Sequence, residues 1–227
     1  MSPALPASED SVPADPGGVP ETLEVVDHPV IAVKLSRARD RTTSSADFRR
    51  LLSEIAGLMT FVACRHLEIE PVEVETPMQR TTGARFARPI TVVPILRAGI
   101  GMTEGILDLL PEARVGHIGV YRDEERMEPV AYYAKLPPDV AESQVLLVDP
   151  MLATGGSASH AVKVLKDRGC RDVRFLCLVA VPAGVRRLVA DHPDVPIVTA
   201  ALDDGLDERC FIRPGLGDAG DRIFGTA

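Results

Sequence analysis

The stretch from Gln144 to Ser157, reading Q-V-L-L-V-D-P-M-L-A-T-G-G-S, constrains the fold more than any other part of the chain. Its apolar run, Val145 to Val148, is typical of a strand buried on both faces of a parallel sheet, and an acid, Asp149, follows. Ser157 is a natural N-cap, and apolar residues after it recur at helical spacing. The order strand, loop, helix places Thr154 to Ser157 at the carboxyl edge of a sheet, where open α/β sheets bind ligands.

The loop Thr154 to Ser157 predicts a phosphate-binding site. Its two glycines let the backbone come close to a ligand, and both hydroxyls and the first helix N–H groups can donate to one anion. A Walker loop would need a lysine after Gly156, and a dinucleotide-binding loop would need G-x-G-x-x-G; the sequence has neither here. For this loop alone, an ordinary strand-to-helix turn with glycines for geometry stays open.

The size and charge of the chain narrow its functional class. At 227 residues it is long enough for one α/β domain with a good core and short for two. The formal net charge of −8 argues against a general nucleic-acid binder, because nucleic-acid phosphates would repel the chain on average. The apolar runs are too short to span a bilayer, and the N-terminus has neither a basic nor an apolar leader region. We expect a cytoplasmic protein with no membrane or nucleic-acid partner.

The first part of the chain divides into an extension and a helix. Residues 1–21 are rich in Pro, Ala, Ser and Asp, so we expect a disordered extension, followed by a single domain over residues 22–227. Residues 25–31 form a short apolar stretch, interpreted as an arm laid on the body or on a partner subunit. A helix is predicted after Ser44, with Ser44 and Asp47 as its capping box.

A second buried strand, Pro89 to Leu96, is predicted to end at a small-residue turn. Before it, residues 72–74 and 83–88 are interpreted as an irregular or hairpin excursion. Arg97 comes directly after the strand, and a helix from Thr103 to Leu110 follows. An arginine at this edge of the sheet places a permanently charged fork where an anion can sit. A surface arginine in an ordinary salt bridge is the alternative.

The remaining segments alternate strands with helices. Arg114 to Tyr121, Asp172 to Ala180 and Pro196 to Leu202 are predicted strands, and Pro182 begins a helix. Residues 129–136 are interpreted as one arm of a projecting hairpin. This alternation predicts an α/β fold with a mostly parallel sheet flanked by helices.

The segment from Phe211 to Thr226 interleaves glycines with the apolar residues Leu216, Ile223 and Phe224. The glycines alone would leave it flexible, whereas the apolar residues are expected to anchor it. We interpret it as a segment built to present backbone groups to a ligand.

Four sequence blocks together carry a resemblance to a known family. They read V-V-P-I-L-R-A-G-I-G-M, Y-R-D-E-E-R-M-E-P-V, V-D-P-M-L-A-T-G-G-S and P-G-L-G-D-A-G-D-R-I-F-G-T. In this order and spacing they resemble the bacterial uracil phosphoribosyltransferases, within the type I phosphoribosyltransferases. The resemblance runs from about residue 25 to residue 226.

The resemblance implies a fold, a reaction and a set of site residues. The fold is type I phosphoribosyltransferase-like, with a β-hairpin arm and a glycine-rich C-terminal hood segment. The reaction joins uracil to 5-phospho-α-D-ribose 1-diphosphate (PRPP), giving uridine monophosphate (UMP) and diphosphate, a step of pyrimidine salvage. The implied PRPP-binding residues are Arg97, Arg122, Asp149, Pro150, Met151, Leu152, Ala153, Thr154, Gly155, Gly156, Ser157 and Asp218. The implied uracil-binding residues are Ile212, Gly217, Asp218 and Ala219, and the implied catalytic residues are Asp149, Arg97, Arg122 and Asp218.

Two departures from the broader type I pattern affect the expected site. Many members have two adjacent acids before the loop, whereas Pro150 follows Asp149 here, so Mg²⁺ is expected to arrive on PRPP and not on paired protein carboxylates. Arg213 stands where the family's tail is expected to be apolar, and its effect on the base pocket is open. The resemblance also implies a homodimer or larger homo-oligomer, and it leaves open whether GTP acts as an allosteric effector.

Two rival functions remain at this point. The first is a phosphoribosyltransferase for another base, against which the P-G-L-G-D-A-G-D tail argues. The second is a regulatory protein that keeps the fold and binds RNA, which the acidic net charge disfavours. Retention on a polyanion column at low salt separates the second from an acidic enzyme.

Overall fold

The computed structural model describes residues 20, 22–122 and 129–226, and for Arg122 and Pro129 it describes the backbone alone. The strands are β1 (Leu23–Val25), β2 (Ile69–Glu75), β3 (Arg80–Phe86), β4 (Ile90–Leu96), β5 (Arg114–Val115), β6 (His117–Arg122), β7 (Pro129–Lys135), β8 (Gln144–Val148), β9 (Met151–Leu152), β10 (Asp172–Ala180), β11 (Ile197–Leu202), β12 (Gly205–Leu206) and β13 (Ile212–Arg213). The helices are α1 (Pro29–Arg39), α2 (Ser45–Ala63), α3 (Ile100–Leu109), α4 (Gly156–Asp167), α5 (Pro182–Asp191) and α6 (Ala219–Phe224), with a 3-10 turn at Val140–Glu142. The expected extension over residues 1–21 lies outside the described residues apart from Pro20.

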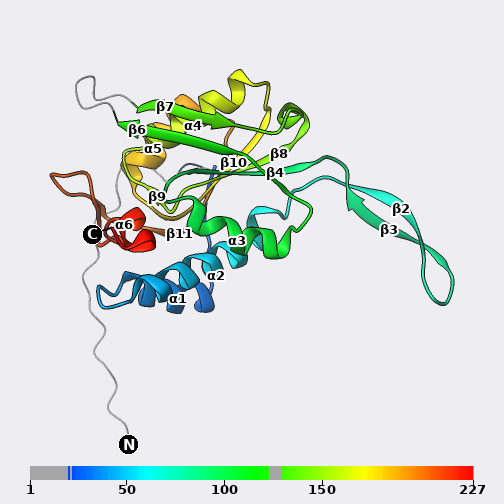
Figure 1. Cartoon of the computed structure of the whole chain (residues 1–227), viewed down its shortest axis with the longest axis horizontal. Coiled ribbons are helices and arrows are strands. Elements are labelled where there is room, and N and C mark those ends of the chain that lie inside the picture. Colours follow the sequence, from blue (N-terminus) through cyan, green and yellow to red (C-terminus); the bar gives the residue numbers. More distant parts are fainter. Residues whose placement is uncertain (1–19, 21, 123–128, 227) are drawn as a thin grey trace, which may run out of the picture.

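The main sheet has the strand order β1-β11-β10-β8-β4-β6-β7 (Figure 1). Every pairing along this order is parallel except β6 with β7, which is antiparallel at one edge. The short strands β5 and β9 pair in parallel with β4 and β10. The carboxyl ends of β4, β8 and β10 therefore meet at one edge of the sheet, which is where the loop after β8 and Arg97 were expected to come together.

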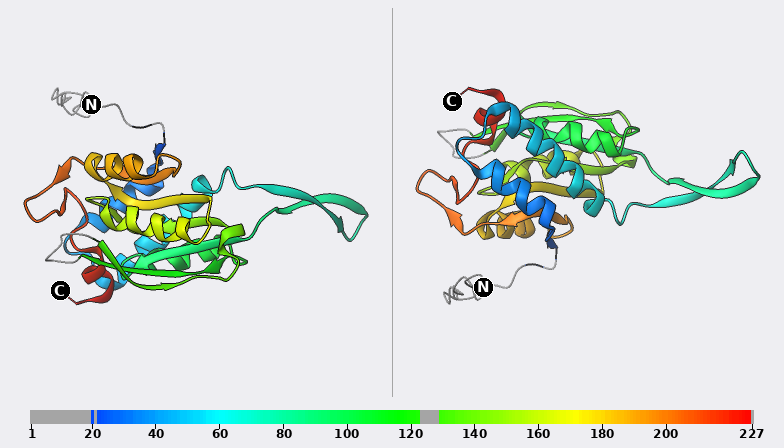
Figure 2. Two further views of the ribbon diagram at one scale, coloured as in Figure 1. Left: turned by 90° about the horizontal axis from the view of Figure 1, so that it is seen from above. Right: turned by 90° about the horizontal axis from the view of Figure 1, so that it is seen from below.

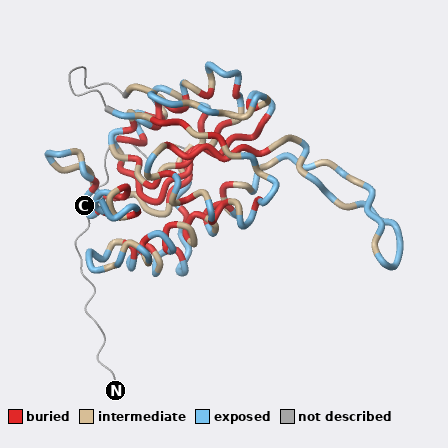
Figure 3. The backbone as a smooth tube through the Cα atoms, in the orientation of Figure 1, coloured by how far each residue is buried: buried red, intermediate tan, exposed pale blue. Residues whose placement is uncertain are grey.

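Two apolar layers cover the sheet, because successive strand residues point to opposite faces. Leu146 and Val148 pack with α1, α2, α3 and α6, whereas Val145 and Leu147 pack with α4 and α5. Figure 1 shows these two groups of helices on opposite sides of the sheet, and Figure 3 shows the buried backbone concentrated between them. Every residue of β8 is buried, as its unbroken apolar run predicted.

The β2–β3 hairpin leaves the body and extends far from it (Figures 1 and 2). The prediction of a projecting arm over residues 129–136 was wrong in its location, because β7 lies along β6 at the sheet edge while residues 69–86 project. The stretch over residues 25–31 lies on the body, which was one of its two expected positions. Its first residue, Val25, belongs to the edge strand β1 beside β11, and Val26 and Ile31 are buried. It is not an extended arm throughout, because Pro29 begins α1 with the His28 side chain accepting the Val30 N–H.

Two other local predictions were confirmed, the cap of α2 and the bounds of β10. Ser44 caps α2, with its hydroxyl accepting the Asp47 N–H, and β10 has the predicted bounds Asp172–Ala180. All four cysteines are free thiols. Within the described residues, no helix combines the length and the apolar character needed to cross a membrane.

Helices α2 and α3 cross at two glycines, and this contact gives a first prediction. A Cβ on Gly105 would lie 1.8 Å from the Ser53 carbonyl oxygen, and one on Gly57 would lie 2.9 Å from the Gly105 carbonyl oxygen. We expect Gly105→Ala to lower the free energy of unfolding by about 3 kcal/mol, because backbone must move apart to admit the methyl group. Urea denaturation measures this. Gly205→Ala is the matched control, because its added Cβ meets nothing within 4 Å, and equal stability of the two variants would contradict the close crossing.

Candidate active site

The residue that begins the candidate site is Asp149, directly after β8. Its N–H donates to the Leu176 carbonyl on β10, at 3.2 Å, which continues the sheet by one residue. Its carboxylate oxygen Oδ1 accepts the Met151 N–H at 3.3 Å. Burial raises the pKa of this carboxyl to about 7, and the Met151 N–H opposes the shift. Ionisation of this half-buried carboxyl group is therefore unfavourable until hydrogen-bond donors of a ligand solvate the negative charge.

The loop after Asp149 first follows the neighbouring strand. The Pro150 carbonyl accepts the N–H groups of Leu178 and Val179, and β9 pairs with the end of β10. The loop then turns at Gly155, whose φ of +79° belongs to the left-handed region that favours glycine. A side chain there is also excluded, because its Cβ would lie 2.7 Å from the Gly184 carbonyl oxygen. The backbone of the loop at Gly155 therefore lies against the backbone of α5.

The start of α4 corrects one expectation. Ser157 was predicted as the N-cap, but α4 begins at Gly156 with Gly155 in the capping position and no side-chain cap. The left-handed Gly155 starts the helix earlier than the serine signal indicated. Ser157 and Thr154 are instead exposed, on and beside the first turn. The first N–H groups of α4 therefore have no side-chain acceptor from the cap and remain available to an anion.

A polar cluster ties α4 to α5 behind the loop. The Ser159 hydroxyl donates to Asp191 Oδ2 at 2.7 Å, and His192 Nε2 lies 2.9 Å from the Ser159 carbonyl oxygen. Arg187 donates to the same Asp191 oxygen at 2.6 Å, and its aliphatic stem covers the space beside Gly155. The cluster fixes the helix end that faces the candidate ligand.

Arg97 stands at the end of β4, with its guanidinium exposed and close to α6. Its Nη2 lies 3.5 Å from Asp221 Oδ1, and its Cζ lies 5.7 Å from the centre of the Phe224 ring. The Leu96–Arg97 peptide bond is cis. The following turn packs on the sheet beside Asp149, since a Cβ on Gly99 would lie 2.5 Å from the Val148 carbonyl oxygen. The Arg97 turn and the end of β8 are therefore neighbours, as predicted.

The C-terminal segment reaches the same edge. Asp218 caps α6 by accepting the Asp221 N–H at 2.9 Å, and Ala219 begins the helix. Leu216 and Ile223 are buried anchors as expected, but the third expected anchor, Phe224, is 42% exposed because it lies on the outer side of α6, beside Arg97.

A pocket of about 710 Å³ lies beside this segment. Ile212 and Gly217 line it, and both were predicted to contact the base. Arg213, the residue that departs from the expected apolar tail, also lines it.

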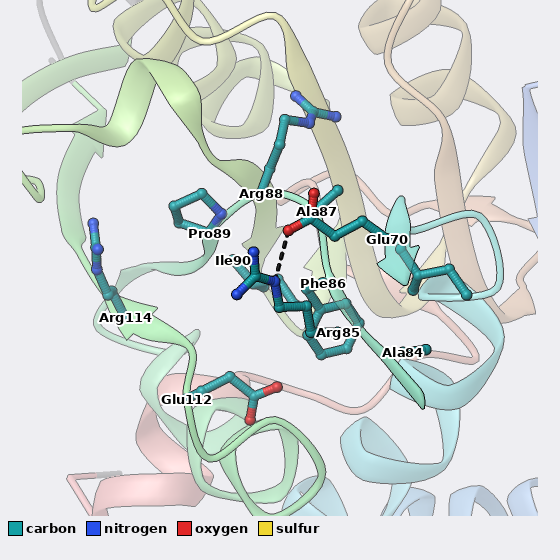
Figure 4. Close-up of a pocket in the computed structure, with 11 residues that line it drawn as sticks. Glu70, Ala84, Arg85, Phe86, Ala87, Arg88, Pro89, Ile90, Glu112 and Arg114 are labelled. Atoms are coloured by element: carbon teal, nitrogen blue, oxygen red, sulfur yellow. Dashed lines mark hydrogen bonds and ion pairs between the residues drawn. The ribbon is translucent and has the colours of Figure 1, made fainter. Parts of the chain in front are cut away.

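A second hollow, of about 860 Å³, lies at the base of the β2–β3 hairpin (Figure 4). Its rim includes Glu70 and Arg85, paired at 2.6 Å, and Glu112 and Arg114 line its other side. None of the predicted site residues lines it. The two hollows lie at opposite ends of the molecule, because the hairpin projects from one end while α6 and the β12–β13 loop occupy the other (Figures 1 and 2).

The structure thus gathers most of the predicted site. Asp149, the loop to Ser157 and the Arg97 turn share one sheet edge, and α6 joins them through Arg97. Arg122 is the last residue of β6, and its side chain lies outside the described residues. Within the described part of the chain, no group of three or more His, Cys, Asp and Glu side chains is arranged to hold a metal ion.

The comparison with known families decides which of the open functions applies. The sequence model described as uracil phosphoribosyltransferase matches residues 25–226. The chain belongs to the uracil phosphoribosyltransferase family. The family that the four sequence blocks indicated is therefore confirmed. Neither rival, a transferase for another base or an RNA-binding regulatory protein, is the family that matches.

Individual members of the family are similar over nearly the whole chain. The uracil phosphoribosyltransferase of Acholeplasma laidlawii (strain PG-8A) is 54% identical over 204 residues, which are 90% of this chain and 98% of the relative. That of Streptococcus pyogenes serotype M5 (strain Manfredo) is 55% identical over 204 residues, 89% of this chain and 98% of the relative. Among solved structures, the AQ2163 protein from Aquifex aeolicus superposes with a TM-score of 0.86 at 33% identity, covering 90% of this chain and 99% of that chain. The expected type I phosphoribosyltransferase-like fold is confirmed.

Sequence reasoning missed several polar residues beside the site. Asp221 contacts Arg97, and Asp203 accepts both terminal nitrogens of Arg39 at 2.8 and 2.6 Å. Asp203 and Arg39 are 164 positions apart. No local pattern pairs residues at that separation, although an acid directly after β11 at the ligand-binding edge was a readable signal.

Proposed function

We propose that the chain transfers the 5-phosphoribosyl group of PRPP to uracil, releasing diphosphate and forming UMP for pyrimidine salvage. The observation that carries this proposal is the meeting of the Asp149 loop, Arg97 and the C-terminal segment at one sheet edge, in a member of this family. The family assignment supports the reaction, and the geometry supports the roles of individual residues.

The phosphoribosyl end of the site rests on the loop after β8. Asp149 accepts hydrogen bonds from the ribose hydroxyls, which supply the donors that its buried carboxylate lacks. The loop from Pro150 to Ser157 holds the 5′-phosphate with the Thr154 and Ser157 hydroxyls and the N–H groups at the start of α4. Asp218 closes the same site from the C-terminal segment.

The leaving diphosphate is held by Arg97, and by Arg122 as the second cation. Breaking the bond between C1 of ribose and the diphosphate leaves an oxocarbenium-like sugar and a departing group of growing negative charge. Preorganised guanidinium groups lower the free energy of that transition state. Uracil N1 then bonds to C1 and releases its proton to the departing diphosphate or to water. Alignment of the base with C1 supplies the rest of the rate enhancement, and no covalent protein nucleophile is required.

Uracil is held by Ile212, Gly217, Asp218 and Ala219. Its carbonyl acceptors and ring N–H donors are complementary to backbone N–H and C=O groups. Cytosine presents an amino donor where uracil has a carbonyl, so donor would face donor, and such a mismatch is strongly unfavourable in a buried site. We therefore propose selection for uracil over cytosine through backbone groups.

Magnesium is proposed to enter with PRPP. The donor set fits this route, because Asp149 is a single carboxylate followed by Pro150, and Mg²⁺ usually keeps several waters and binds substrate phosphates. When bound, Mg²⁺ would neutralise part of the diphosphate charge. A cytoplasmic location is proposed with the same reaction, and no role is assigned to GTP.

A homodimer or larger homo-oligomer is also proposed. The β2–β3 hairpin stands away from the body, and Figure 3 shows it largely exposed or half-buried. The apolar residues Ile69 and Met78 of this arm are 65% and 91% exposed. A lone hairpin with exposed apolar side chains is at best marginally stable in water, so a second copy is a fitting partner for it. The mass of the native protein in solution tests this.

The assay that tests the reaction follows UMP formation from uracil, PRPP and Mg²⁺, beside cytosine, hypoxanthine and orotate. We expect turnover with uracil alone, because the other bases do not match the donor and acceptor pattern. Turnover with a different base would keep the PRPP loop and discard the assignment of Ile212 and Gly217 to Ala219. The absence of turnover with all four bases would refute the proposed function.

A further inference from the structure

The strap, which is the loop from Gly205 to Arg213, supplies most of the residues that line the pocket of about 710 Å³ beside the C-terminal segment. Its two ends pair as the antiparallel strands β12 and β13, and Figure 2 shows it extending from the end of the molecule opposite the hairpin. Asp203 fixes its base, because this buried carboxylate accepts both Arg39 nitrogens and the Gly215 N–H at 2.8 Å. The base of the strap is thereby held to α1.

The tip of the strap is held by Asp207. Its Oδ1 accepts the N–H groups of Arg209 and Phe211 at 3.0 and 2.9 Å. Its Oδ2 accepts Nε and Nη2 of Arg213 at 3.1 and 2.8 Å. Each carboxylate oxygen thus has two donors from within the strap, which leaves Asp207 little capacity to accept from a ligand. The N–H of Phe211 is the leading cause of a pKa of Asp207 below its usual value, so the carboxylate is ionised near neutral pH.

The lining of this pocket offers backbone to a ligand. Ile212 lines the pocket although the whole residue is only 3% exposed, because its side chain belongs to the core, and Gly217 has no side chain. What these residues can present to a base is therefore N–H and C=O groups. Such groups recognise a ligand only if the backbone is held in place, and Ile212 lies between Phe211 and Arg213, both of which Asp207 binds.

We propose that Asp207 and Arg213 are positioning residues for the pyrimidine: their contact fixes the backbone of Phe211 and Ile212 in the geometry that binds the base. The inference rests on the proposed function and answers what Arg213 does at a position expected to be apolar. Its side chain is 69% exposed and turned to Asp207, so it stabilises the strap and does not need to touch the base. If the contact were merely structural, its loss would lower stability and raise KM for both substrates alike. If it positions the base, its loss raises KM for uracil alone.

Steady-state kinetics of the full chain with uracil and PRPP test the proposal. We expect Asp207→Ala to raise KM for uracil by about tenfold, because small displacements of a recognition group weaken binding strongly. KM for PRPP and kcat at saturating uracil are expected to stay within about twofold, because the loop after β8 and Arg97 are untouched. Asp207→Asn keeps an oxygen that can accept the two backbone N–H groups, so its KM for uracil is expected to fall between those of the native chain and Asp207→Ala.

Controls separate this proposal from its alternatives. Asp204→Asn removes an exposed carboxylate directly before the strap and is expected to leave all three constants unchanged. Arg213→Met removes only the exposed partner of the contact, so it is expected to fold and to raise KM for uracil. The double variant Arg213→Met with Asp207→Ala should have a KM for uracil no higher than that of Asp207→Ala alone. An unchanged KM for uracil in folded Arg213→Met and Asp207→Ala, or equal rises in KM for uracil and PRPP, would overturn the proposal. A native chain that forms no UMP would refute the proposed function instead.

Discussion

Asp149→Asn is expected to lower kcat/KM for PRPP by about 10² to 10³-fold. The asparagine keeps the size of the side chain and an oxygen that accepts the Met151 N–H. It loses the negative charge that the ribose hydroxyls solvate and that faces the positive charge developing on the sugar. Initial rates at varied PRPP measure the effect.

The raised pKa of Asp149 makes this prediction dependent on pH. Because the carboxyl titrates at about 7 in the folded chain and at about 3.9 when unfolded, the folded chain binds the extra proton between these values. Stability contributed by this group therefore falls as pH rises from about 4 to about 7. Asp149→Asn has no such charge, so it should be more stable than the native chain by on the order of 3 kcal/mol at pH 8 and by less at pH 5.

The same titration predicts opposite trends for stability and activity. In the native chain, kcat/KM for PRPP should rise as pH increases through about 7, because the ionised form accepts the ribose hydroxyls. Asp149→Asn should lose that rise. Glu142→Gln, an exposed acid outside the site, serves as the control. Native activity in Asp149→Asn, or a stability gain that does not grow with pH, would remove Asp149 from the proposed role.

Arg97→Ala is expected to lower kcat by about 10² to 10³-fold while the chain stays folded. The guanidinium is 58% exposed and lies 3.5 Å from Asp221, and an exposed pair of this kind contributes roughly 0 to 1 kcal/mol to stability. The substitution should therefore weaken the stabilisation of the departing diphosphate and leave the stability of the fold nearly unchanged. Arg97→Lys should recover only part of the rate, because an ammonium group cannot form the same two-pronged contact with a phosphate.

Arg50→Ala is the matched control for Arg97→Ala. Arg50 is 57% exposed and pairs with Asp47 at 2.9 Å on the surface of α2, so the two variants remove the same group at nearly the same exposure. We expect Arg50→Ala to retain native turnover. Comparable losses in both variants would point to a general effect of charge, and full turnover in Arg97→Ala would exclude Arg97 from the diphosphate site.

The chain shows clearly which features local pattern can predict. The apolar run of β8 predicted a strand buried on both faces, and parallel strands bring their carboxyl ends to one edge, so Asp149 and Arg97 could be placed together from the residues alone. The start of α4 could not be placed as well. A serine signals an N-cap by its side chain, whereas the left-handed Gly155 sets the helix start through backbone geometry.

The sequence by itself determined the central strands, the loop between β8 and α4 and the family, because these depend on residues adjacent in the chain and on blocks of fixed order. Only the tertiary structure decided that Arg39 holds Asp203 and that Arg213 turns to Asp207 beside the pocket. It also decided that the hairpin over residues 69–86 projects, whereas residues 129–136 lie along the sheet edge. These outcomes depend on side chains and strands that meet only after the sheet has folded. Local residue patterns determine where helices and strands form. The packing of helices and strands that are distant in the sequence determines which polar side chains pair.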